Sequence, residues 1–91
     1  MHVQPLHAAV AGQHLEVARL LLAAGVDVNA RQQGGFAPLH AAAQNGHAPL
    51  VRLLLQYGAD AAQCTDDGRR ALDFALAGGR EEAAAALQGA G

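Results

Sequence analysis

The chain has 91 residues, a 52% hydrophobic composition and a formal net charge of −2, and all six basic residues are arginines scattered among acidic ones. This length limits the chain to one small domain, and the charge balance excludes the basic face that nucleic acids require. No apolar run approaches the roughly 18–20 residues of a membrane span, and the single Cys64 permits no internal disulfide, so we expect a cytoplasmic domain without membrane contact.

The first predicted elements are two short helices near residues 5–11 and 15–24. An irregular segment over residues 26–37 follows them, and its adjacent glycines, Gly34 and Gly35, are turn signals. We expect a hairpin-like connection in this segment.

Two further helices are predicted in the middle of the chain, separated by Gly46. The first begins at Pro38, where a missing N–H costs nothing, and Gly58 suits a left-handed cap that ends the second. Apolar residues recur along the second helix at i, i+3, i+4 and i+7, which is the period of an amphipathic helix: Leu50, Leu53, Leu54 and Tyr57. After a second irregular segment with the turn signal Asp66-Asp67-Gly68, we expect a last pair of helices near residues 71–77 and 81–88.

An internal repeat of 33 residues relates these helix pairs. Sliding the chain by 33 positions places PLHAA at residues 5–9 on residues 38–42, and RLLL at 19–22 on 52–55. A further slide retains scattered identities, so a third unit is degenerate but in register. One helix pair cannot bury its own apolar faces, whereas stacked pairs can, and the repeat therefore predicts a stack of equivalent units.

The period and its motifs resemble the ankyrin repeat. The matching features are Pro-Leu-His in two units, the Gly46-His47 junction between helices, and RLLLQYGAD at residues 52–60. The resemblance implies one all-α domain, a solenoid of three helix pairs with short β-hairpin or loop connections, divided at residues 1–33, 34–66 and 67–91. It also implies a concave surface of hairpin tips and first helices that binds another protein, with no catalytic activity and no cofactor.

Some positions depart from the family pattern. The junction Ala11-Gly12-Gln13 resembles an N-terminal capping repeat, and the alanine-rich last helix resembles a C-terminal cap that is less apolar because no further unit packs on it. Gln32 and Thr65 stand where the family often has Asp, so we expect weaker hydrogen bonding in the two connections.

Histidine, cysteine and aspartate each suggest a chemical site that the pattern does not favour. The resemblance implies that the recurring His7 and His40 bond the backbone of the neighbouring connection, so we expect no metal site. Cys64 lies beside Asp66 and Asp67, whereas a nucleophilic thiolate needs a base and an electropositive setting. These aspartates lack the spacing of a calcium loop, and we interpret them as turn residues.

The residues predicted to bind a partner lie on the connections and at the end of the middle first helix. They are Arg31, Gln33, Phe36, Gln44, Asn45, Asp66, Asp67, Arg69 and Arg70. Phe36 has two open interpretations: it is either an aromatic anchor for the partner or a residue whose ring packs against the neighbouring connection.

Two other functions stay open on this reasoning. The chain could form a weak homo-oligomer by stacking the apolar face of its first unit on a second copy, which a concentration-dependent mass would reveal. It could also be a regulatory fragment of a larger protein or enzyme, which only the parent sequence would show.

Overall fold

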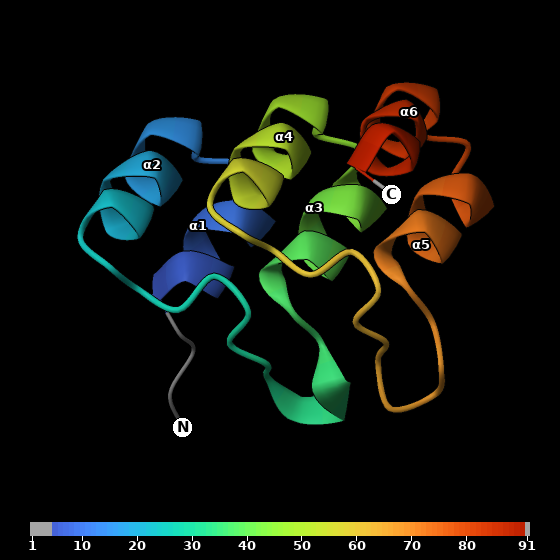
Figure 1. Cartoon of the computed structure of the whole chain (residues 1–91), viewed down its shortest axis with the longest axis horizontal. Coiled ribbons are helices and arrows are strands. Elements are labelled where there is room, and N and C mark those ends of the chain that lie inside the picture. The colour runs from blue at the N-terminus through green and yellow to red at the C-terminus, as the bar shows by residue number, and fades with distance from the viewer. Residues whose placement is uncertain (1–4, 91) are drawn as a thin grey trace.

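Three helix pairs stacked side by side make up the computed structural model, which describes residues 5–90. They are α1 (Pro5–Ala11) with α2 (Leu15–Ala23), α3 (Pro38–Asn45) with α4 (Ala48–Gln56), and α5 (Ala71–Ala77) with α6 (Glu81–Ala90). The helices α1, α3 and α5 form one layer and α2, α4 and α6 form the other (Figure 1). We call these pairs the first, second and third units. The predicted helices are confirmed to within two residues at each end.

The helices of the second unit begin and end where the sequence predicts. Pro38 is the first residue of α3, and Gly46 ends it in the left-handed conformation with a φ of 72°. Gly58 follows α4 with a φ of 93°, and the N–H of Ala59 closes the turn by donating to the Leu54 carbonyl at 2.9 Å. Glycine occupies these positions because a Cβ atom disfavours positive φ.

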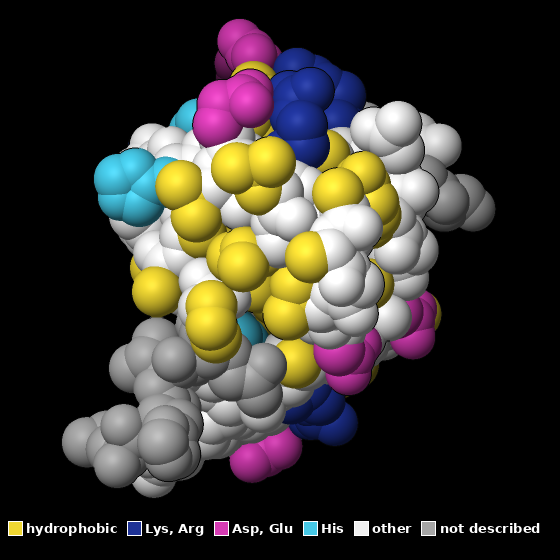
Figure 2. Space-filling model, turned by 90° about the vertical axis from the view of Figure 1, so that its left-hand side faces the viewer, with side chains coloured by type: hydrophobic (Ala, Val, Ile, Leu, Met, Phe, Trp, Pro, Cys, Tyr) yellow, Lys and Arg dark blue, Asp and Glu magenta, His cyan; other side chains and the backbone are white. Residues whose placement is uncertain are grey.

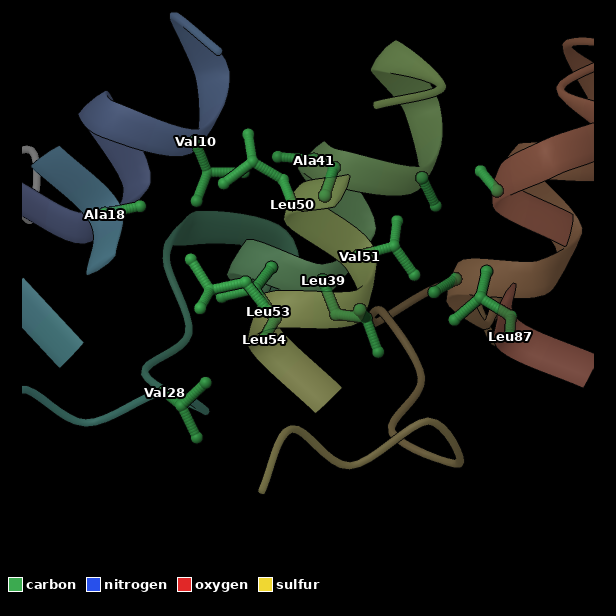
Figure 3. Close-up of a cluster of buried hydrophobic side chains, with 14 of the residues drawn as sticks. Val10, Ala18, Val28, Leu39, Ala41, Leu50, Val51, Leu53, Leu54 and Leu87 are labelled. Atoms are coloured by element: carbon green, nitrogen blue, oxygen red, sulfur yellow. The ribbon is translucent and has the colours of Figure 1, made fainter. Parts of the chain in front are cut away.

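The core lies along α4, which is covered by α2 on one side and α6 on the other. Leu50, Val51 and Leu54 are completely buried in it (Figure 3). In the other layer, Ala42 and Ala43 of α3 are also completely buried, and their small side chains allow close approach of α1 and α5. The hydrophobic stripe of the middle unit is therefore the centre of the domain.

The two long connections project from the same side of the stack (Figure 1). The first contains the 3-10 turn η1 (Gln33–Gly35) and one antiparallel bridge between Gln32 and Phe36. Within residues 5–90 the connections form no β-strand, because Gly34 and Gly35, both at positive φ, reverse the chain within a single turn and leave one residue pair to bridge. The expected hairpins are thus tight loops.

Thr65 takes part in several hydrogen bonds of the second connection, and the expectation of weaker bonding there stays a prediction. Its hydroxyl donates to the Asp67 carboxylate and accepts from the Arg69 N–H at 3.2 Å. Its own N–H donates to the Arg69 carbonyl at 2.8 Å. A threonine hydroxyl both donates and accepts, so it serves this tight loop where the family often has Asp.

None of the helices in the described part of the chain has the length and apolar character needed to cross a membrane.

Candidate interaction surface

Two buried histidines fix the connections to the helices. The Nε2 atom of His7 lies 2.9 Å from the Ala30 carbonyl oxygen, and that of His40 lies 2.9 Å from the Gln63 carbonyl oxygen. His40 Nδ1 accepts from the Ala37 N–H at 2.9 Å, so Nε2 carries the proton and donates it. The predicted bonds from His7 and His40 to the neighbouring connections are confirmed.

Both histidines favour the neutral state. Burial lowers the pKa of His7 and of His40 below the ordinary 6.5, although the carbonyl partner of each acts in the opposite direction. Protonation of His40 would also turn Nδ1 into a donor facing the Ala37 N–H. Among residues 5–90, no three His, Cys, Asp or Glu side chains are grouped to hold a metal ion.

Arg31 ties the first connection to the second. Its guanidinium donates to the Gly35 carbonyl at 3.3 Å and to the Cys64 carbonyl at 3.0 Å, and it lies 3.4 Å from the Asp66 carboxylate. The N–H of Asp66 donates to the Gly34 carbonyl at 2.8 Å. The tips of the two connections are therefore joined into one surface.

Gly35 is buried beneath this joint. A Cβ atom there would clash with the Arg31 guanidinium and lie 2.6 Å from the Asp66 carboxylate. The absence of a side chain at Gly35 thus allows the two tips to approach each other.

Phe36 belongs to an aromatic cluster that spans two units. Its ring is 5.6 Å from that of His40 and meets the ring of Phe74 edge to face at 5.5 Å. The guanidinium of Arg69 lies over the ring of Phe74, 5.2 Å from the ring centroid. These contacts give Phe36, whose side chain is half-buried, a packing role, although its ring meets the helices α3 and α5 and not the neighbouring connection.

The other predicted residues divide into bonded and exposed ones. Asn45 donates from its side-chain amide to the Ala11 carbonyl at 3.3 Å and so links α3 to the end of α1. Asp67 accepts from the Thr65 hydroxyl, which is the main cause of its lowered pKa, and lies 3.4 Å from Arg69. Gln33, Gln44 and Arg70 are exposed.

Sequence reasoning missed Phe74 as a member of this surface. The register offers a signal that could have found it: Asp73 occupies the position of His40 in the third unit, so the next residue lies beside His40 once the units stack. The role of Arg31 as a link between connections was also missed, because its acceptors are mostly backbone carbonyls that carry no sequence pattern.

Stacked helix pairs with joined, projecting connections define a helical-repeat solenoid. The sequence profile for ankyrin repeats, in three copies, matches residues 6–91, so the chain belongs to the ankyrin-repeat family. Domains of this family are generally protein-binding modules, and they are typically non-catalytic. A comparison with curated proteins finds no match.

Proposed function

We propose that the chain is a non-catalytic recognition module that binds another protein through its connection tips and the exposed ends of its first helices. The observation that carries this proposal is the joint between the two tips. Arg31 and the bond from Asp66 to Gly34 hold exposed polar side chains in one fixed arrangement. A surface that is ordered before binding loses less conformational entropy when a partner docks.

The contacts suggest a division of labour among the residues of this surface. Arg31, Phe36 and Asn45 maintain its shape through contacts within the chain. Gln33, Gln44, Asp66 and Arg70 present exposed side chains, and Arg69 exposes its guanidinium beside Asp67. We assign the direct contacts with the partner to these exposed residues, and we include Asp67 among them.

Cys64 supports a location in a reducing compartment, and we propose the cytoplasm. Its half-buried thiol is free and donates weakly to the Ala62 carbonyl at 3.6 Å. Intracellular proteins commonly keep such thiols reduced.

Site-specific photo-crosslinking tests the proposed surface. A photoreactive residue at Gln33 or Gln44 should capture the same partner from a cell extract. The same residue at Gln56, which is exposed on α4 in the other helix layer, should not capture it. Capture from Gln56 alone would place the binding surface on that layer and contradict the proposal.

Charge-removal variants give a second readout once the partner is in hand. Replacing Arg69 and Arg70 with alanine should slow association and flatten its dependence on salt, because exposed charges at an interface act mainly on the association rate. An unchanged association rate would remove these two residues from the interface.

A further inference from the structure

The helix α2, at the end of the stack formed by the first unit, exposes two large hydrophobic side chains. Within residues 5–90, four large hydrophobic side chains are exposed: Val17, Leu20, Tyr57 and Leu76. Val17 and Leu20 lie three positions apart on α2, and therefore on one face, with exposed fractions of 49% and 68%. Hydrophobic side chains gather over this end of the molecule, with acidic and basic ones near its edge (Figure 2).

The repeat shows what this face is shaped to contact. Leu50 and Leu53, 33 positions after Val17 and Leu20, are 0% and 8% exposed. The first and second units both have a following unit, but only the second has a described unit before it. Contact with a preceding unit thus accounts for the burial of Leu53, and the outer face of α2 continues this stacking interface without a described neighbour.

The two ends of the stack differ in how many hydrophobic side chains they could place against the outer face of α2. Leu22, on the side of α2 that meets the second unit, is 4% exposed. The corresponding position in the third unit, 66 residues later, is the exposed Gln88. Of the four exposed large hydrophobics, only Leu76 lies in the third unit. For the outer face of α2, the same face of a second copy is therefore a more hydrophobic partner than the third-unit end of that copy.

From these observations we propose that the outer face of α2 is a self-association surface, on which a second copy of the chain docks through the same face about a two-fold axis. Closed two-fold contacts of this kind are the commonest in homo-oligomers. The surface lies on an end of the stack and is separate from the connection tips.

Charge and size agree with a weak, reversible contact. The charged side chains of α2 are Glu16 and Arg19, and they pair with each other at 3.4 Å, so α2 adds no net charge to the contact. The molecule measures 29 × 25 × 21 Å, and this end spans the two shorter dimensions. Two whole ends in contact would bury on the order of 1,000 Å² in total, so the α2 faces alone bury less, which is below the range of stable interfaces.

Sedimentation equilibrium of the whole chain from about 10 μM to 1 mM tests the proposal. The mass should rise from 9.3 kDa toward twice that value. The Leu20→Glu variant should stay monomeric at every concentration, whereas the matched Leu76→Glu variant, changed at the opposite end, should associate as the wild type does. Circular dichroism confirms that each variant is folded before its mass is compared.

Cross-linking supplies a second, independent readout. In a Cys64→Ser background, the Leu20→Cys variant should form a covalent dimer with oxidised glutathione at several times the yield of the Leu76→Cys control. A wild-type mass that stays at the monomer value throughout would overturn the proposal. Assemblies larger than a dimer that disappear in Leu76→Glu would also overturn it, because they would show head-to-tail stacking.

Discussion

The rings of Phe36 and Phe74 meet edge to face with their centroids 5.5 Å apart, although the two residues are distant in the chain. Phe36 lies at the end of the first connection and Phe74 lies on α5, so their contact pins that connection to the third unit. Because His40 also touches both rings, the connection is held from two sides.

We expect Phe36→Ala to destabilise the fold. Replacing a fully buried phenylalanine with alanine lowers the free energy of unfolding by about 3–5 kcal/mol. The Phe36 ring is half-buried, so we expect a smaller loss of about 1–3 kcal/mol, measured by urea unfolding. The Phe36→Leu control keeps apolar volume and loses only the edge-to-face contact, at about 0.5–1.5 kcal/mol. If Phe36→Ala changes the free energy of unfolding by less than 0.5 kcal/mol, the ring does not anchor the connection.

The buried histidines make stability depend on pH. Burial lowers the pKa of His7 and His40, so the unfolded chain, with its ordinary value of 6.5, binds more protons than the folded protein. The free energy of unfolding should therefore be fully present above about pH 6.5 and decrease as the pH falls below it. The His40→Gln variant should show a smaller slope between pH 7 and 5, measured by urea unfolding. An unchanged slope would mean that His40 does not contribute.

The two glycines of the first tip should respond differently to alanine. Gly34→Ala has open space around the new Cβ and incurs only the strain of a positive φ, about 1–2 kcal/mol. Gly35→Ala incurs the same strain and also displaces Arg31 and Asp66, so it should cost more. Urea unfolding of both variants measures the difference. Equal costs would show that the two connections separate without loss of stability.

Gln13 offers a stabilising change. It has a φ of 61° and is, within residues 5–90, the only residue other than glycine at positive φ; Gly46 and Gly79 occupy its position in the other units. Gln13→Gly should raise the free energy of unfolding by about 0.5–1 kcal/mol, because the relief of strain exceeds the added entropy of the unfolded chain. Gln56→Gly, at the end of α4, should instead destabilise. A loss of stability in Gln13→Gly would contradict the strain.

Leucines in the middle and at the end of the stack should contribute unequally to the stability of the fold. Leu54 is completely buried on α4 between neighbouring helices on both sides. Leu54→Ala should therefore lower the free energy of unfolding by about 2–5 kcal/mol. Leu87 on α6 has a neighbouring unit on one side only in the described structure, so Leu87→Ala should cost less. Thermal unfolding compares the two variants, and equal losses would argue against the third unit as a terminal cap.

The sequence by itself determined the helices and their ends. The stripe from Leu50 to Leu54, the proline at the start of α3 and the glycines at helix ends act within a few residues of the chain, so local geometry predicts them. Tyr57, which the pattern placed on the same stripe, instead follows the last residue of α4 and is 41% exposed. The bonds of His7 and His40 were implied by the family resemblance, and both were confirmed because the repeat reproduces the same local fold twice.

Only the tertiary structure decided which side chains meet across units. Phe36 and Phe74 are distant in the chain, and the offset between stacked units, together with the rotamers of both rings, brings them into contact. The reach of Arg31 to the Cys64 carbonyl depends in the same way on how closely two connections approach. The exposure of Leu20 and the burial of Leu53 arise at equivalent sequence positions, because burial depends on the presence of a neighbour and not on the residue type.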